Sequence, residues 1–352
     1  MSVFSSFAAR LRIYPIIQAP MAGVATPELA AAVSNSGGLG SIGIGASSVS
    51  QAKEMISRTK ALTSKPFNVN VFCHAPALRN EPLERAWLQR MEPLFQECEM
   101  DVPTSLNEIY KSFIADEEVF QMLLEERPAV VSFHFGLPTA QQVSLLKDEG
   151  ICTLATATNL DEARQIQKLG LDAIVAQGIE AGGHRGVFDL DAVDEQLTMP
   201  VLVRLLVKNT DLPIIAAGGI MDGQGIHAAL ELGAAAAQLG TAFILCPESA
   251  ANEGYRAALR SEHASNTRLT SVFSGRPARG IVNQFIQHLD RGSETQVAAY
   301  PLAYDAAKRL SAAAANKGNH KFAAHWAGQG APMARELPAE DLMNKLIEEW
   351  RR

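Results

Sequence analysis

Short apolar runs alternate with longer helix-forming segments along most of the chain, and this alternation constrains the fold more than any other feature. The runs have the composition of buried strands, at residues 16–19, 39–43, 67–72, 129–134, 151–155, 173–176, 212–217 and 235–239. Eight strands, each followed by helical sequence and by polar or glycine-rich loops, predict a (β/α)8 TIM barrel. The alternative, a doubly wound open sheet, would be favoured by a G-x-G-x-x-G pattern, which residues 18–24 lack.

Two regions fall outside the alternation. Residues 74–127 form an excursion that is longer than a β-α unit needs, and residues 246–352 are rich in alanine and largely helix-forming. We therefore predict a barrel at 1–245 that carries the excursion, and a mainly helical substrate-binding or lid region at 246–352. Helices are expected at 81–98, at 106–126 and, closing the chain, at 337–350.

Composition excludes several classes of protein. The chain has 352 residues and a net charge of −7, and no cluster of Lys and Arg indicates a nucleic-acid surface. Its four cysteines are scattered, so neither a disulfide framework nor a metal site is expected, and a reducing cytoplasm is the expected compartment. The N-terminus has no secretory signal, and the most apolar stretch, 232–245, is too short and too broken for a membrane span.

The glycine-rich loop at residues 176–186 is the predicted centre of the chemistry. It follows the strand at 173–176 and combines Glu180, His184 and Arg185 with several glycines. Glycine allows positive φ and a close approach of backbone to a ligand. Histidine is the side chain that most readily exchanges a proton near neutral pH. His184 is therefore the candidate catalytic residue.

Two later loops predict a phosphorylated ligand. Gly218 and Gly219 end the seventh strand, and the segment 238–241 ends the eighth, where barrels commonly bind phosphate. Exposed backbone N–H groups and the hydroxyl of Thr241 would act as donors. FMN, a sugar phosphate and pyridoxal phosphate all remain possible at this point, although no strand ends in the lysine that pyridoxal phosphate would require.

A Y-P-x-x-Y-x-x-x-K pattern stands out in the C-terminal region. Tyr304 and Lys308 are four residues apart, so they share one face of a helix, and Tyr300 lies one turn earlier. On the third strand, Asn68 and Asn70 alternate with valines, so their side chains are expected to face a site.

Several of these motifs together resemble the FMN-dependent nitronate monooxygenases of class I, formerly called 2-nitropropane dioxygenases. The motifs are Q-A-P-M-A-G at 18–23, G-G-L-G at 37–40, N-V-N at 68–70, S-F-H-F-G at 132–136, Q-G-I-E-A-G-G-H at 177–184, A-G-G-I at 217–220, Q-L-G-T at 238–241 and the Tyr300 to Lys308 pattern. The resemblance covers residues 16–241 and extends toward the C-terminus. The loop ending in His184 is also similar to that of flavin-dependent enoyl-acyl carrier protein reductases and NADH:quinone reductases. Ala22 departs from the pattern, since many relatives carry glycine there.

The resemblance implies a role for each matching residue. His184 would be the catalytic histidine. FMN would be bound at the mouth of the barrel by Met21, Ala22, Asn70, Gln177, Gly182, Gly218, Gly219, Gln238, Leu239, Gly240 and Thr241. The substrate pocket would be lined by Tyr110, His134, Tyr300, Tyr304 and Lys308.

The reaction that the resemblance implies is oxidation of alkyl nitronates, such as propionate 3-nitronate, by O2. Electrons would pass through a flavin semiquinone, and the products would be a carbonyl compound and nitrite or related nitrogen oxides. The expected partners are a small anionic nitronate and O2, with no nucleic acid and no membrane, in a monomer or a homodimer. Two alternatives remain: an NAD(P)H-dependent quinone or enoyl-thioester reductase with the same FMN, and a barrel that binds flavin or phosphate without catalysis.

Overall fold

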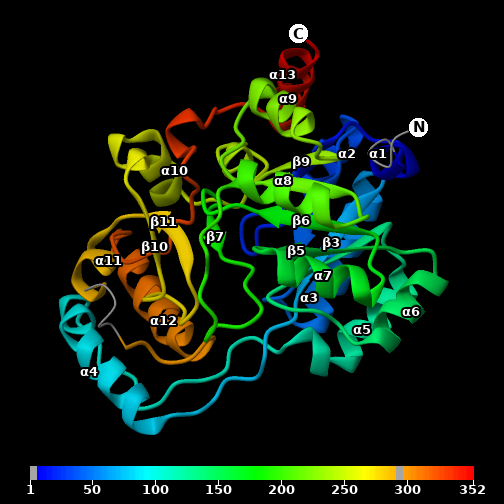
Figure 1. The fold of residues 1–352 in the computed structure, drawn as a ribbon. Coiled ribbons are helices and arrows are strands. Elements are labelled where there is room, and N and C mark those ends of the chain that lie inside the picture. Colours follow the sequence, from blue (N-terminus) through cyan, green and yellow to red (C-terminus); the bar gives the residue numbers. More distant parts are fainter. Residues whose placement is uncertain (1–5, 291–295) are drawn as a thin grey trace.

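Eight parallel strands form the central barrel of the computed structural model, which describes residues 6–290 and 296–352 (Figure 1). The strands lie in the order β1-β9-β8-β6-β5-β4-β3-β2, and a parallel bridge between Ile17 and Leu39 joins β1 to β2. This confirms the predicted TIM barrel. The strands are β1 (Ile16–Gln18), β2 (Gly40–Gly43), β3 (Phe67–Phe72), β4 (Val130–His134), β5 (Cys152–Ala157), β6 (Ala173–Gln177), β8 (Ile214–Ala217) and β9 (Ala236–Leu239).

Side chains alternate between the inside and the outside of the barrel, as the two-residue period of a strand requires. On β4, Val130 packs in the interior cluster, whereas Val131 and Phe133 pack in the cluster with the surrounding helices. Toward the carboxyl ends of the strands the interior residues become polar, for example Asn70 on β3 and Gln177 on β6. Apolar residues therefore fill the lower barrel, and polar residues surround its mouth.

Helices cover the outside of the barrel. Several begin with the signals that sequence predicts: Thr26 accepts a hydrogen bond from the N–H of Leu29 at the start of α2, and Asn159 caps α7 in the same way. The barrel helices are α2 (Pro27–Asn35), α3 (Val49–Leu62), α5 (Glu117–Glu126), α6 (Ala140–Asp148), α7 (Leu160–Leu169), α8 (Met199–Asn209) and α9 (Gly223–Glu231).

The C-terminal helix α13 (Ala339–Arg351) completes this outer ring. It packs between α9 and α2, with Leu342, Met343 and Leu346 buried in the same cluster as the other barrel helices. No helix of the ring follows β9 directly, because the chain first leaves the barrel and returns only at α13. Near the N-terminus, α1 (Ser6–Leu11) contributes Phe7 to the interior cluster of the barrel.

The region between β9 and α13 has its own core and a small sheet. It contains α10 (Glu253–Arg260), α11 (Gln284–Leu289) and α12 (Leu302–Asn316), together with the short 3-10 helices η3 (Thr241–Phe243), η4 (Glu262–Ser265) and η6 (Ala331–Met333). The expectation of a mainly helical region omitted an antiparallel sheet of β10 (Thr267–Thr270), β11 (Ala278–Ile281) and β7 (Gly183–His184). Because β7 belongs to the loop at 176–186, this sheet joins the C-terminal region to the predicted catalytic loop.

The excursion after β3 packs on this C-terminal region. Helix α4 (Glu81–Glu97) places Trp87, Met91 and Phe95 in one apolar cluster with residues of α11 and α12, and Figure 1 shows α4 beside α12. The expected helix at 106–126 was only partly right. Residues 106–112 have no helix, and the helical segment is η2 (Phe113–Ala115) followed by α5.

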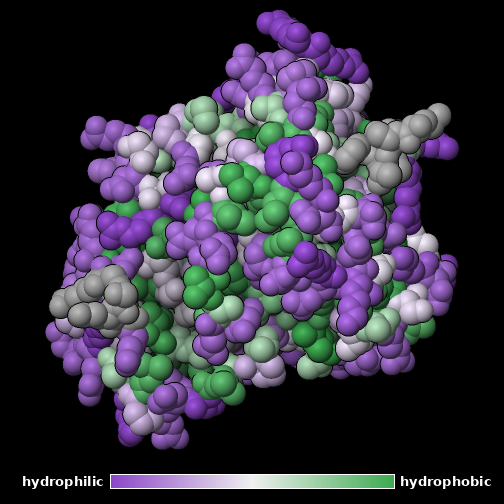
Figure 2. Space-filling model, viewed as in Figure 1, coloured by the Kyte–Doolittle hydropathy of each residue, from purple (hydrophilic) through white to green (hydrophobic). Residues whose placement is uncertain are grey.

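The surface is mainly hydrophilic on the face shown in Figure 2, with apolar side chains in separate groups between charged ones. Within residues 6–290 and 296–352, no helix combines the length and the apolar character needed to cross a bilayer.

Candidate active site

A cavity of about 830 Å³ opens at the carboxyl ends of the barrel strands. Its size lies within the range of pockets that hold a cofactor-sized ligand. Its lower wall is built by inward-facing residues at the strand ends, including Ser132, Thr156 and Gln238, and its upper wall by the C-terminal region.

Nearly all the residues that sequence proposed for the site line this one cavity. They are His184, Met21, Ala22, Asn70, Gln177, Gly182, Gly218, Gly219, Gln238, Gly240, Thr241, Tyr110, His134, Tyr300, Tyr304 and Lys308. Leu239 does not line it. Its side chain is 1% exposed and packs among the outer helices, because it alternates with Gln238 along β9. Only the backbone of Leu239 is left for a ligand.

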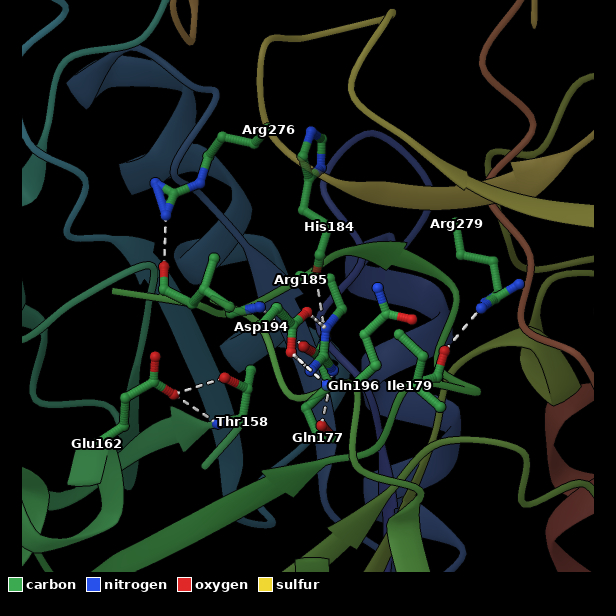
Figure 3. Close-up of polar contacts among 12 residues, drawn as sticks. Thr158, Glu162, Gln177, Ile179, His184, Arg185, Asp194, Gln196, Arg276 and Arg279 are labelled. Carbon is green, nitrogen blue, oxygen red and sulfur yellow. Dashed lines mark hydrogen bonds and ion pairs between the residues drawn. The ribbon is translucent and has the colours of Figure 1, made fainter. Parts of the chain in front are cut away.

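The loop at 176–186 is held by a buried ion pair. The guanidinium of Arg185, 1% exposed, donates to both carboxylate oxygens of Asp194 at 2.9 Å and to the carbonyl of Gln177 at 2.8 Å (Figure 3). Gln177 in turn accepts from the N–H of Gly186 at 2.8 Å and donates to the carbonyl of His184 at 2.9 Å. Both polar ends of the Gln177 amide are thus used to fix the loop. The two parallel charge-assisted hydrogen bonds between Arg185 and Asp194 restrict the geometry of the loop further.

His184 is fixed at its backbone and at its ring. As part of β7 it pairs with Ala278 of β11, and its carbonyl lies 3.2 Å from His134 Nε2. Its own Nε2 lies 2.8 Å from the hydroxyl of Ser274. A histidine ring with one nitrogen engaged has its other nitrogen, here Nδ1, available to a ligand.

Aromatic side chains surround the His184 ring. The ring centroids of Trp326, Phe135, Tyr300 and Tyr304 lie 5.1, 5.6, 5.8 and 5.9 Å away, respectively. Phe135 has a φ of +74°, a left-handed conformation that costs a non-glycine residue roughly 1–2 kcal/mol. Strained residues of this kind are concentrated at functional sites. A small planar ligand would therefore meet rings on several sides.

Burial and nearby charge keep the histidines of the site neutral. Burial, His134 and the positive charge of Arg276 lower the pKa of His184 to about 3. Burial is also the main reason that the pKa of His134 is lowered to about 4. Arg276 itself is so enclosed that burial lowers its pKa to about 10. At neutral pH the site contains uncharged imidazoles beside a buried cation.

A second group lies near the rim of the cavity. The ammonium of exposed Lys308 lies 5.1 Å from the ring centroid of Tyr110 and 5.5 Å from that of Tyr304, distances typical of cation–π contacts. Burial raises the pKa of Tyr110, Tyr300 and Tyr304, so their hydroxyls remain protonated donors. Lys308 and the tyrosines therefore form a set of donors suited to an anion.

The loops after β8 and β9 line the cavity with glycines and with Thr241. Gly218 and Gly219 have φ values of +123° and +71°, which a residue with a side chain adopts only with strain. The hydroxyl oxygen of Thr241 accepts from the N–H of Gly328 at 3.0 Å, so its proton can be donated to a ligand. Within the described residues, no group of His, Cys, Asp or Glu side chains is arranged to hold a metal ion.

Three site residues were not recognised from the sequence: Trp326, Phe135 and Arg276. Phe135 stood in the quoted S-F-H-F-G motif, and Arg276 in the turn at 274–277, but neither had been assigned to the site. Trp326 gave no local signal, since it lies outside helices and strands. An isolated bridge pairs its backbone with Gly280, and its ring contacts that of His184 directly.

Comparisons with known proteins agree on one family. A sequence profile of nitronate monooxygenase matches residues 5–349. The chain is 56% identical over 335 residues to "Nitronate monooxygenase" of Paraburkholderia phytofirmans, covering 95% of this chain and 92% of the relative. It is 54% identical over 337 residues to the protein of the same name in Pseudomonas aeruginosa, covering 96% of both.

Solved structures share the fold of the whole chain. A nitroalkane oxidase from Streptomyces ansochromogenes superposes with a TM-score of 0.90 at 38% identity, over 97% of each chain. FabK from Thermotoga maritima superposes with a TM-score of 0.74 at 28% identity, over 99% of this chain and 96% of that one.

Proposed function

This chain belongs to the nitronate monooxygenase family, a family of oxidoreductases, and we propose that it oxidises alkyl nitronates such as propionate 3-nitronate with O2. The products would be a carbonyl compound and nitrite or related nitrogen oxides. One observation carries the proposal: a single cavity joins the glycine-rich loops after β8 and β9 to a neutral histidine that aromatic rings surround, and Lys308 lies beside two of the tyrosines that line it.

The cavity fits FMN as the cofactor. Gly218 and Gly219 have no side chain to keep a phosphate from their backbone N–H groups, and Thr241 has a hydroxyl proton to donate to it. Ala22 and Gly240 add little bulk where a planar ring system would enter. FMN, when bound, would take electrons from the substrate and pass them to O2. The residues proposed to hold it are Met21, Ala22, Asn70, Gln177, Gly182, Gly218, Gly219, Gln238, Gly240, Thr241 and the backbone of Leu239.

The substrate anion would be bound by donors that this chain keeps protonated. Lys308 supplies positive charge at the rim, and Tyr110, Tyr300 and Tyr304 supply hydroxyl protons inside a wall that excludes water. Charge-assisted hydrogen bonds in a buried site are stronger than those in water, so these groups would orient the two nitronate oxygens.

His184 would meet the substrate as an uncharged imidazole. A nitronate is already deprotonated, so its oxidation requires no general base. The hydrogen bonds to the nitronate oxygens would come from Lys308 and the tyrosines, and His184 would accept a proton from a neutral nitroalkane. The low pKa of His184, caused mainly by burial, keeps the ring able to accept that proton at neutral pH.

The proposal is tested by the absorbance spectrum of the purified protein, followed by anaerobic mixing with propionate 3-nitronate and, separately, with NADH. The expected result is a flavin spectrum that changes with nitronate, does not change with NADH, and recovers when O2 is admitted with release of nitrite. Reduction by NADH with no response to nitronate would instead identify the quinone or enoyl-thioester reductase. A protein that takes up no FMN would contradict the proposed cofactor.

A substitution tests the assigned role of His184. His184→Asn should lower turnover of a neutral nitroalkane by roughly 100-fold or more, the usual range for a positioned general base, while FMN stays bound. His227→Asn is the matched control, because His227 is exposed on α9 and lies outside the cavity lining. Normal turnover by His184→Asn would remove His184 from the mechanism.

A further inference from the structure

The turn at residues 274–277, which precedes β11, lies against the loop at 176–186 that contains His184. The hydroxyl of Ser274, whose side chain is fully buried, lies 2.8 Å from His184 Nε2. The next residues of the same turn are fixed to the loop as well: the N–H of Arg185 donates to the carbonyl of Pro277 at 2.8 Å, and Ala278 pairs with His184. Ser274 is therefore held in register with His184 by backbone pairing.

The hydroxyl of Ser274 has three polar neighbours but only one proton. It accepts from the N–H of Arg276 at 3.2 Å, and it lies 3.2 Å from the carbonyl oxygen of Arg276. If His184 Nε2 carries a proton and donates to Ser274, the hydroxyl is free to donate to that carbonyl. The reverse arrangement would leave the carbonyl of Arg276 without this donor. Buried polar groups are nearly always satisfied, so the first arrangement is favoured.

Arg276 places a positive charge behind the aromatic wall. Its side chain is 2% exposed, and its guanidinium carbon lies 4.4 Å from the ring centroid of Phe135 and 5.7 Å from that of Tyr300. It donates to the carbonyl of Val187, whereas its Nε has no partner among the described residues (Figure 3). In the described part of the chain, no carboxylate lies within ion-pair distance of it. Glu162 is the carboxylate whose charge acts on it from beyond contact distance. A buried cation without a contact ion pair acts on its surroundings at longer range than a paired one.

We infer that the turn of Ser274 and Arg276 is the positioning device of His184. Ser274 holds the ring in one orientation with the proton on Nε2, and the guanidinium of Arg276 opposes a second proton. Nδ1 is thereby kept unprotonated, which is the form that can accept a proton from a neutral nitroalkane. The inference rests on the proposed function only in taking His184 as the group that meets the substrate.

Other charged and titratable groups also face His184. They are His134 on β4, behind the loop, and Tyr300 and Tyr304 at the start of α12. The tyrosines are neutral because burial raises their pKa, and His134 is neutral because burial lowers its pKa. Arg185, the next residue, is paired with Asp194, so Arg276, behind the rings of Phe135 and Tyr300, is the unpaired cation that acts on His184.

The tautomer of His184 can be measured directly by NMR on protein labelled with 15N-histidine, with His184→Asn used to assign its signals. The wild type is expected to show one neutral tautomer, with the proton on Nε2. Ser274→Ala should give a mixture of tautomers and about a fivefold to tenfold lower kcat, the loss expected for one hydrogen bond. Ser274→Thr, which keeps the hydroxyl, should restore the single tautomer.

The matched control for Ser274→Ala is Ser271→Ala, in the same turn. The hydroxyl of Ser271 makes no hydrogen bond within residues 6–290 and 296–352, so its loss should change neither the tautomer nor kcat. A merely structural effect of the turn would change kcat without changing the tautomer. If Ser274→Ala does not fold, the nearly isosteric Ser274→Cys gives the same readout.

The charge of Arg276 is tested by comparing Arg276→Gln with Arg276→Lys. Arg276→Gln should raise the pKa of His184 by roughly one unit, whereas Arg276→Lys should leave it close to the wild-type value. The inference is overturned if Ser274→Ala keeps a single Nε2–H tautomer, or if Arg276→Gln leaves the pKa of His184 unchanged. Since these readouts need no turnover, a failure of the proposed reaction would be seen separately, in the nitronate and NADH mixing experiment.

Discussion

The ion pair of Arg185 and Asp194 offers a test in which the size of the effect follows from burial. Asp194→Ala would leave the guanidinium of Arg185, 1% exposed, with only the carbonyl of Gln177 as a partner. Breaking a buried pair costs about 3–5 kcal/mol. Because the side chain of Asp194 is 17% exposed, we expect the lower end of that range, about 3 kcal/mol.

That free energy converts to a measurable shift in melting temperature. Unfolding entropy is about 2.1 cal/mol/K per residue, so a chain of 352 residues has roughly 0.7 kcal/mol/K. A loss of about 3 kcal/mol in the free energy of unfolding therefore lowers Tm by about 4 °C. Asp191→Ala is the control, since Asp191 is exposed in the same loop and makes no ion pair in the described structure.

The pH dependence gives an independent check. Burial raises the pKa of Asp194, but the hydrogen bonds from Arg185 and from the N–H of Gln196 outweigh it, so the net pKa is lowered. A carboxyl with a lowered folded-state pKa stabilises the protein above its unfolded pKa of about 3.9, and this contribution disappears as pH falls through the folded pKa. Asp194→Ala and the wild type should therefore differ most near neutral pH and converge in acid.

Differential scanning calorimetry of the wild type, Asp194→Ala, Asp191→Ala and the double variant Arg185→Met/Asp194→Leu would decide the matter. The double variant should recover most of the lost stability, because two apolar residues replace the pair without leaving a buried charge. The reasoning is refuted if Asp194→Ala melts within a degree or so of Asp191→Ala at neutral pH.

Three further predictions concern the site. Gly182→Ala should displace the loop at 176–186 and abolish FMN retention, because the added Cβ would lie 2.5 Å from the N atom of Gly328. Gly183→Ala should lower the free energy of unfolding by only about 1–2 kcal/mol, because its Cβ would meet no atom within 4 Å and only its φ of +75° is unfavourable. Thermal unfolding and flavin content of the two variants test this difference. Lys308→Met should raise KM for propionate 3-nitronate by roughly tenfold with little change in kcat, measured as initial rates of O2 uptake; an unchanged KM would exclude a charge role. Since the pKa of His184 is about 3, kcat for the nitronate should show no inflection near pH 6.5 in the wild type, and an inflection there that disappears in His184→Asn would contradict the neutral ring.

The barrel could be predicted from the sequence because its signals are local. Each strand is a short apolar run beside a helix start such as Thr26 or Asn159, and parallel strands necessarily bring their carboxyl ends to one face. Asn70 was placed in the site by the same two-residue period that the structure shows. Applied to β9, that period would also have turned Leu239 away from the cavity.

The walls around His184 could not be predicted, because they depend on pairing between distant segments. Two residues, Gly183 and His184, form β7, which is too short to give any periodicity, and its partner β11 lies about ninety residues later. The loop at 106–112 was expected to be helical, yet it is irregular and carries Tyr110 into the cavity. Tertiary packing overrides local propensity at such positions.

The place of α13 in the ring has a consequence for biosynthesis. The barrel strands end at Leu239, but the helix that fills the gap between α9 and α2 begins only at Ala339. Chains are made from the N-terminus and fold as they emerge. The apolar surface of α9 and α2 that α13 covers therefore stays exposed until the region between β9 and α13, which forms the upper wall of the cavity, has been synthesised. Translation thus sets the order of synthesis: the segments that form the upper wall of the cavity are made before the last helix of the ring around the barrel.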